Sequence, residues 1–400
     1  MKKMKNLNVS FVHPDDALQI EQEHQTNFLV QNKTLGIQTL HHAVLAPGGL
    51  NGEIGGIWNE KGEHLSSTYV HWMKNTQPPP PPKIEKRIEE SVVYVGFWLG
   101  CWGHEITDHL RYFWVFFNQH YAHLKNLKWV YAPTTICIKP NENFLSYLKS
   151  LHLPIENLMA ITQATEFKTI ILPDECFWNE NNFGFYTPEF LAILARLPQM
   201  PAPLFDVEKV YFSRLNFQSE KDFNEESLKN YFEKHGFHIV YPEKITFLQE
   251  LVILQHCRIF AATDGSICHN LIFANPQTAL ILRKCRHSTG YQISINKMKT
   301  NTNIVYIDVG FSPFADYFKK EWNLGPFFVY ESSFLRAYFG EKKGIFPFFK
   351  FVQFCFRQSK NKIRQWNWTY IDHTFLAWTH SWRAKLKLGS RLRKMFKNPW

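Results

Sequence analysis

Cysteine is scarce and scattered in this sequence, and that argues against two kinds of small, cross-linked fold. The 400 residues hold seven cysteines, an odd number, and no two are spaced as Cys-x-x-Cys. A disulfide framework or a zinc ribbon needs paired cysteines at short spacings. Because disulfides persist mainly in oxidising compartments, we predict a cytoplasmic protein.

Long apolar runs are also absent. No run approaches the ~20 residues that a transmembrane helix requires. The opening residues, MKKMKNLNVSFVHPDDALQ, include lysines but lack the apolar core of a secretory signal. The apolar fraction of 45% still allows two sizeable cores, and 400 residues suit two domains plus an appendage.

Three motifs for metal or phosphate chemistry are incomplete. Glycines punctuate residues 39–69, but no Gly-Lys-Ser/Thr follows them, so tight turns are a better interpretation than a phosphate loop. His104-Glu105-Ile106-Thr107-Asp108 lacks the second histidine of a zinc-protease helix, and His109 is displaced by ~100°. Asp15-Asp16 is a bare acidic pair. We therefore predict no metal and no cofactor.

Acidic residues almost vanish from the last sixty positions. Residues 341–400 hold 14 Lys and Arg against 2 Asp and Glu, whereas the other 340 hold 31 against 33. A helical stripe of apolar side chains runs through this segment: Trp368, Ile371, Phe375, Trp378, Trp382 and Leu386. Aromatic and basic residues on opposite helix faces are typical of a membrane-interface helix. We predict that residues 385–400 contact an anionic membrane surface or are disordered, and that residues 368–382 either contact the membrane or pack on the N-terminal domain.

Residues 210–276 alternate short apolar runs with helical patterns. Strands are predicted at residues 210–212, 237–241, 258–262 and 279–282. Between them, Asn224 reads as the N-cap of a helix that Gly236 ends, and Thr246 with Gln249 has the capping-box form before a helix at residues 247–256. A further helix is predicted at residues 266–274. Alternation of this length implies a parallel sheet with right-handed crossovers.

Polar residues follow these strands where ligands of parallel sheets bind, which indicates a nucleotide-type site. Arg214, next to Ser213, offers a planar fork for a phosphate, or forms a surface ion pair with Glu225 or Glu243. Gly265 and Ser266 begin a predicted helix, where free N–H groups favour an anion.

Three further residues near these strand ends have open roles. Glu243 could accept hydrogen bonds from ribose hydroxyls or be a solvated turn residue. Asp264 caps the following helix or contacts a sugar, and Asn270 holds the loop or the ligand.

A second α/β unit precedes this one. Strands are predicted at residues 92–98, 127–132 and 169–173, helices at 144–152 and 188–197, and a proline-rich boundary at 199–203. After the first of these strands, His104, Asp108 and Arg111 share one helix face. His104 is the candidate general base because imidazole titrates near pH ~6.5, with Asp108 orienting it or acting as the base itself.

Both regions resemble glycosyltransferase family 61. The resemblance is carried by Gly103-His104…Asp108…Leu110 upstream and by Tyr211-Phe212-Ser213-Arg214, Asn224-Glu225, Tyr241-Pro242-Glu243 and Asp264-Gly265-Ser266 downstream. It departs at Asp264, where many relatives have histidine, at Glu250, where glutamine is usual, and at an arginine missing before Asn224.

The resemblance implies an inverting, metal-independent enzyme of the GT-B type, with two Rossmann-like domains facing a cleft. The donor would be a UDP-linked or similar nucleotide sugar carrying a hexosyl or N-acetylhexosaminyl group. The acceptor would be a glycan or lipid-linked glycan of a surface polysaccharide such as capsule or lipopolysaccharide. Catalytic roles would fall to His104 and Asp108, and donor binding to the C-terminal domain.

The predicted organisation is a polar segment at 1–38, an acceptor-side domain at 39–200, a nucleotide-sugar domain at 201–340 and a basic tail at 341–400. The tail would hold the protein on the inner face of the cytoplasmic membrane. A non-catalytic nucleotide-sugar or glycan-binding protein of the same fold is the alternative. A nucleic-acid partner is not predicted, because the main body is near neutral.

Overall fold

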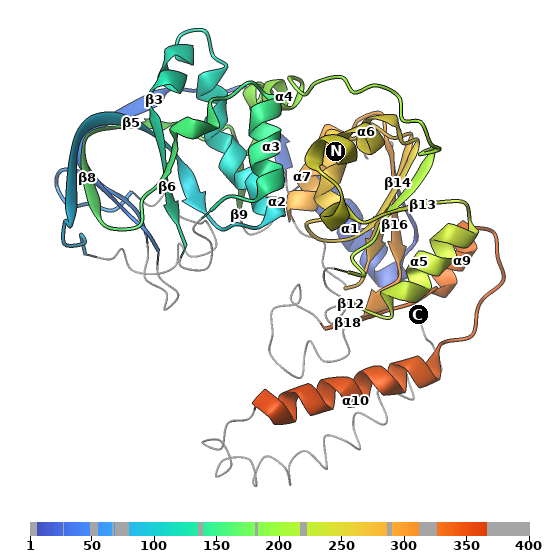
Figure 1. Cartoon of the computed structure of the whole chain (residues 1–400). Helices are drawn as coiled ribbons and strands as arrows, with labels where there is room; N and C mark the ends of the chain where they lie inside the picture. The colour runs from blue at the N-terminus through green and yellow to red at the C-terminus, as the bar shows by residue number, and fades with distance from the viewer. Residues whose placement is uncertain are drawn as a thin grey trace.

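The computed structural model describes residues 6–26, 28–48, 55–65, 68, 80–134, 139–180, 183–216, 222–285, 290–311 and 326–365. These residues form two six-stranded and two three-stranded sheets with helices around them, which confirms the predicted α/β class. Figure 1 shows the two large sheets side by side, with α2, α3, α6 and α7 between them.

The first large sheet has the strand order β4-β3-β8-β5-β6-β7. These strands are, in that order, Gly56–Trp58, Ile37–Ala46, Thr165–Pro173, Lys86–Trp98, Lys128–Pro133 and Leu158–Ala160. The last four are mutually parallel, whereas β3 runs antiparallel to both neighbours. The final seven residues of β5 are all buried, because helices and strands cover both faces there.

The second large sheet, β1-β16-β15-β14-β11-β13, is parallel throughout. Its strands are Leu7–Phe11, Asn303–Asp308, Thr278–Arg283, Ile259–Thr263, Lys209–Phe212 and His238–Val240. Helices α5 (Glu225–Lys234), α6 (Phe247–His256) and α7 (Gly290–Met298) accompany it. The capping box of Thr246 and Gln249 is confirmed at the start of α6.

We call the first large sheet and its helices the first half of the molecule, and the second large sheet and its helices the second half. Two elements of the second half come from residues 1–38, where the sequence pattern predicts none. Strand β1 pairs with β16, Leu7 opposite Ile304, and helix α1 (Pro14–Thr26) follows it. The buried positions of α1 are Asp16, Ile20 and His24, four residues apart. Two of these three are polar, so an apolar period does not reveal the helix.

Shorter elements complete the described chain. A three-stranded sheet of β2 (Phe28–Val30), β10 (Phe183–Tyr186) and β9 (Phe177–Glu180) lies beside α4 (Pro188–Leu194) and α7. Another joins β12 (Asp222–Phe223), β18 (Phe327–Val329) and β17 (Gly310–Phe311). Helices α9 (Ser333–Tyr338) and α10 (Phe348–Gln365) follow.

The predicted tail helix at 368–386 and the basic residues up to 400 lie outside the described residues. Among the helices that the structure does describe, none combines the length and apolar character needed to span a bilayer.

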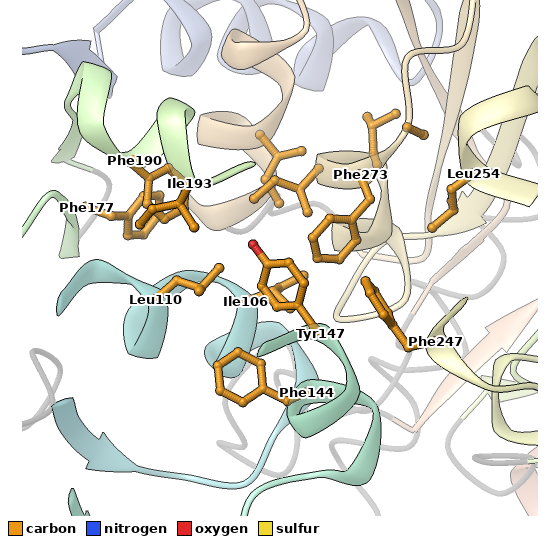
Figure 2. Close-up of a cluster of buried hydrophobic side chains, with 14 of the residues drawn as sticks. Ile106, Leu110, Phe144, Tyr147, Phe177, Phe190, Ile193, Phe247, Leu254 and Phe273 are labelled. Atoms are coloured by element: carbon orange, nitrogen blue, oxygen red, sulfur yellow. The ribbon is translucent and has the colours of Figure 1, made fainter. Parts of the chain in front are cut away.

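The two halves meet at a continuous apolar interface, which we call the seam. Figure 2 shows Tyr147 of α3 beside Phe247 of α6 and Phe273, with Ile106 next to Tyr147 and Phe144 on its other side. Leu110 lies on the side of the cluster that holds Phe177, Phe190 and Ile193. The Tyr147 ring lies 5.4 Å from that of Phe247 and 5.2 Å from that of Phe273, centroid to centroid. Because this core is continuous across the halves, polar loops beside it are held at fixed positions.

Candidate functional site

The polar loops of the second half converge because its large sheet is parallel. The carboxyl ends of β11, β14 and β15 lie at one edge, and each is followed at once by polar residues. Arg214 follows β11, Asp264 follows β14 and Lys284 follows β15. All three side chains are buried. The structure therefore brings together residues that are up to 70 positions apart in sequence.

Asp222 of β12 forms ion pairs with both cations, Lys284 and Arg214. Its carboxylate lies 2.8 Å from Lys284 Nζ and 3.5 Å from Arg214 Nε. Burial lowers the pKa of Lys284, while the charge of Asp222 raises it. Arg214 is thus a buried member of a charge cluster, which contradicts the alternative of a surface ion pair with Glu225 or Glu243.

Glu225 organises the loop after β11. Its Oε1 accepts hydrogen bonds from Tyr211 Oη and Ser213 Oγ, both at 2.9 Å, and from the Arg214 backbone N–H at 2.7 Å. Burial raises the pKa of Glu225, and these three donors lower it. Ser213, predicted to bind the donor, therefore holds the loop in shape.

Asn224 does not cap α5 in the predicted way. It has a left-handed backbone, with φ of 72°, and its side chain donates to the Val329 carbonyl at 2.9 Å. The amide is therefore used to fix β18 beside the helix.

The loop after β14 also differs from prediction. Residues 264–267 form a turn, and a 3-10 helix, η8 (Cys268–Phe273), replaces the predicted α-helix at 266–274. Gly265 has φ of +130°, and a Cβ there would lie 2.9 Å from Arg214 Nη1. The Arg214 guanidinium therefore lies directly over a backbone without a side chain.

Asp264 sits at the base of this turn. Its backbone N–H donates to the Leu282 carbonyl. Burial raises the pKa of Asp264 to about 6, against the lowering influence of Lys284, Arg283 and the Gly265 N–H. With a pKa of about 6, the carboxyl is mainly ionised at neutral pH and takes up a proton in mildly acidic solution.

His104 and Asp108 meet at the seam, where the chain leaves β5. A short helix, α2 (Trp102–His104), passes into a π-turn, η3 (Glu105–His109), and then a 3-10 helix, η4 (Leu110–Phe116). His104 Nδ1 lies 2.5 Å from Asp108 Oδ2. Tyr291 of α7 donates to the same oxygen at 2.8 Å, so the carboxylate is held from both halves.

The predicted third member of this face, Arg111, forms an ion pair with Glu175, its Nη1 lying 3.4 Å from Glu175 Oε1. Its charge also lowers the pKa of Asp108, so it stays electrostatically coupled to the pair. Burial alone would lower the pKa of His104, but the hydrogen bond and charge of Asp108 outweigh it, so this pKa is raised. The pKa of Asp108 is lowered by the same contact, against the effect of burial.

A second bridge crosses the seam through Asn270. Its Oδ1 accepts from Trp102 Nε1 at 2.5 Å, and its Nδ2 donates to Glu250 Oε1 at 2.5 Å. Of the two roles predicted for Asn270, the geometry supports the structural one. Burial raises the pKa of Glu250 to about 8, against the lowering effect of the Asn270 hydrogen bond.

This pKa makes stability depend on pH. Glu250 is protonated when folded but ionised when unfolded between pH 4.5 and about 8, so folding takes up a proton there. The free energy of unfolding should fall as pH rises through this window. Glu250→Gln keeps the acceptor but cannot ionise. Urea unfolding of Glu250→Gln at pH 5 and pH 8 should show a flatter pH dependence than the wild type and, at pH 8, a gain of up to ~5 kcal/mol, since the pKa rises from 4.5 to about 8 and one pKa unit equals ~1.4 kcal/mol. Equal pH slopes for both proteins would contradict this.

His269 is a seam residue that the sequence analysis missed. It is buried, and neither ring nitrogen has a hydrogen-bond partner among the described residues. A Cβ on Gly103 would lie 2.7 Å from its Nδ1, so glycine permits this approach. Burial lowers its pKa to about 3, which keeps the ring neutral. In the sequence, only the position of His269 next to Asn270 points to this residue.

Glu243 and Ser266, two further residues predicted to bind the donor, lie in different surroundings. Glu243 is exposed in the turn η7 (Pro242–Lys244), which follows the edge strand β13. Ser266 Oγ lies 3.5 Å from Cys101 Sγ across the seam. Residues 264–266 thus reach both sides: Gly265 lies under Arg214, and Ser266 lies beside the loop that carries His104. Across the described ranges, no three His, Cys, Asp or Glu are grouped to hold a metal.

Comparison with known protein families identifies the region that holds the candidate site. The sequence model of the family described as Glycosyltransferase 61 matches residues 69–281, more than half of the chain. Every predicted site residue, from His104 to Asn270, lies inside this range. No curated protein sequence matches.

Proposed function

The chain belongs to glycosyltransferase family 61, and we propose that it moves a sugar, with inversion and without a metal, from a nucleotide sugar to a glycan or lipid-linked acceptor. The donor would be UDP-linked and would carry a hexosyl or N-acetylhexosaminyl group. The product would belong to a surface polysaccharide such as capsule or lipopolysaccharide. The two large sheets, meeting at the seam, support a GT-B arrangement with two Rossmann-like halves.

One observation carries this proposal: three consecutive residues connect a cationic cluster with a histidine–carboxylate pair. Gly265 lies beneath Arg214, and Ser266 approaches Gly103, the neighbour of His104. Transfer from a nucleotide sugar needs a cation for the leaving diphosphate and a base for the acceptor hydroxyl. Both groups, placed along one turn, fit the two ends of such a reaction.

The cationic side suits the diphosphate. Arg214 and Lys284 lie at the carboxyl ends of parallel strands, the usual ligand edge of such sheets. A guanidinium fork binds phosphate oxygens in pairs, and a buried one does so with little screening. Asp222 keeps both cations in place before the ligand arrives.

On the other side, His104 is the general base and Asp108 positions it. When Nδ1–H donates to Asp108, Nε2 keeps its lone pair and can accept the proton of a hydroxyl. The carboxylate stabilises the resulting imidazolium, and Tyr291 fixes the carboxylate. In an alternative that uses the same residues, His104, Asp108 and Tyr291, Asp108 is itself the base.

Arg214→Ala should weaken binding of uridine diphosphate by roughly 10- to 100-fold, because a hydrogen bond to a charged group contributes about 1.5–3 kcal/mol. Isothermal titration calorimetry measures this directly. Arg258→Ala is the matched control, since Arg258 is an exposed arginine paired with Glu208. Arg214→Lys, which keeps the charge but loses the fork, should fall between. Wild-type affinity in Arg214→Ala with the fold intact would remove Arg214 from the site.

A non-catalytic nucleotide-sugar or glycan-binding protein of the same fold is the second candidate, and it is favoured by Asp264, which stands where the family resemblance leads us to expect histidine. Donor-dependent transfer or hydrolysis by the wild type separates the two. The cytoplasmic location on the inner membrane face, held by residues 385–400, is a further part of the proposal.

A further inference from the structure

Helix α10 (Phe348–Gln365) has one side seated on the protein. Phe351 and Phe354 are buried, and the Phe354 ring lies 5.4 Å from Phe223 and 5.6 Å from Phe328, centroid to centroid. Figure 1 shows the helix running along the far side of the small β12–β18 sheet, away from both large sheets. The helix is therefore anchored by this contact and otherwise projects from the body.

The other side of α10 exposes large apolar rings. Phe349 is 88% exposed and Phe356 is 66% exposed. The two are seven residues apart, so they point the same way, and both lie opposite Phe351 and Phe354. Just before the helix, Ile345 is 99% exposed. Aromatic side chains exposed to this extent along one helix face mark an interaction surface.

The charges around these rings are all of one sign. Lys350 and Arg357 are exposed on α10, each next in sequence to one of the two phenylalanines. Lys342 and Lys343 are exposed just before it. No acidic residue occurs between Glu341 and Asp372. Among the described residues from 342 to 358, the exposed charged side chains are therefore all cationic.

We propose that this face of α10, formed by Phe349, Phe356, Lys350 and Arg357, docks the protein on an anionic lipid bilayer. Phenylalanine rings insert at the headgroup boundary while neighbouring cations bind anionic headgroups. A second copy of the chain is a poorer occupant, because a two-fold contact through this face would oppose cation to cation. The docking surface is separate from residues 385–400 and does not depend on them.

The small sheet links this surface to the candidate site. Phe223 of β12 contacts Phe354, and its neighbour Asp222 binds Lys284 and Arg214. A bilayer docked on α10 is thus separated from the cationic cluster by that helix and one thin sheet. If the proposed function holds, this placement selects membrane-borne, lipid-linked acceptors over free glycans. The docking itself does not rest on the transferase activity.

Co-sedimentation of the full chain with vesicles tests the proposal. Wild type should bind phosphatidylglycerol-containing vesicles, bind pure phosphatidylcholine weakly, and dissociate as salt rises. The double variant Phe349→Ser/Phe356→Ser should lose at least tenfold in vesicle affinity, and Lys350→Gln/Arg357→Gln should lose a similar factor. Leu204→Ser/Phe205→Ser removes two exposed apolar side chains elsewhere and should leave binding unchanged.

Unchanged vesicle affinity in both α10 variants would overturn the proposal. So would a wild type that ignores the vesicles but sediments as an oligomer that Phe349→Ser/Phe356→Ser converts to a monomer, since the face would then bind protein. Melting temperatures establish that each variant is folded. Uridine diphosphate affinity, measured without vesicles, reports on the donor site alone, so a failure of docking and a failure of the proposed function give different results.

Discussion

Asp108→Asn is expected to lower turnover by ~100-fold or more while leaving uridine diphosphate affinity within a factor of two. The amide has nearly the size of the carboxylate, so the seam keeps its packing. It carries no charge to stabilise a protonated His104, and its amide group can present N–H toward Nδ1, which selects the wrong tautomer. Steady-state kinetics with the identified donor and acceptor gives the measurement.

The pH profile distinguishes a positioning role from a merely structural one. Asp108 raises the pKa of His104, so the acidic limb of kcat/KM should lie above the ordinary value of 6.5. In Asp108→Asn the lowering effect of burial, the largest cause, is opposed only by the weaker raising effects of Cys101 and Glu105, and the limb should move to lower pH. An unmoved limb would contradict the assignment of His104 as the titrating base.

Two further variants act as controls. His104→Ala should lose as much turnover as Asp108→Asn, because both remove the same acid–base function. Tyr291→Phe deletes one 2.8 Å hydrogen bond to Asp108 but leaves its charge, so a loss of roughly tenfold or less is expected. Near wild-type turnover in both His104→Ala and Asp108→Asn would place the base elsewhere.

Arg283→Met should cost about 3–5 kcal/mol in the free energy of unfolding, the largest loss of stability expected in the chain. Arg283 is 1% exposed, and its guanidinium lies 3.1 Å from Asp16 and 2.9 Å from Asp308. Methionine fills much of the space but leaves two buried carboxylates without their cation. Because Asp16 belongs to α1, the variant should also loosen that helix.

Arg258→Met provides the matched control for this experiment. Arg258 lies 3.0 Å from Glu208, the same kind of contact, but both side chains are about half exposed. An exposed pair contributes at most ~1 kcal/mol. Urea unfolding of the two variants isolates burial as the cause. Equal losses would show that the Arg283 cluster is no more important than a surface pair.

The second half of the fold could be predicted closely because local signals agree with burial there. The bounds of α6 follow from a capping box and an apolar run, and the structure has both. Strands β11, β14 and β15 are short continuous apolar runs, as expected where both faces are covered. Once those strands are predicted, Arg214 and Asp264 are identified as polar residues at the strand ends.

The predictions that differ from the structure concern side chains that make tertiary contacts. Local sequence patterns do not predict such contacts. Asn224 was assigned by cap propensity, yet its amide binds Val329, more than a hundred residues away. The π-turn after His104 and the 3-10 helix that follows it cannot be predicted from a 3.6-residue period. His269 has no periodic or motif signal at all.

Strand β1 has a consequence for synthesis. Its partner β16 emerges from the ribosome about 300 residues later, roughly 15–60 s at ordinary elongation rates. Until then the β16 edge of the second sheet does not exist, and β1 has nothing to pair with. A fragment that begins at residue 201 would leave that edge bare, a template for strand addition between copies. We therefore expect such a fragment to aggregate, whereas supplying residues 6–26 as a separate peptide should rescue its solubility.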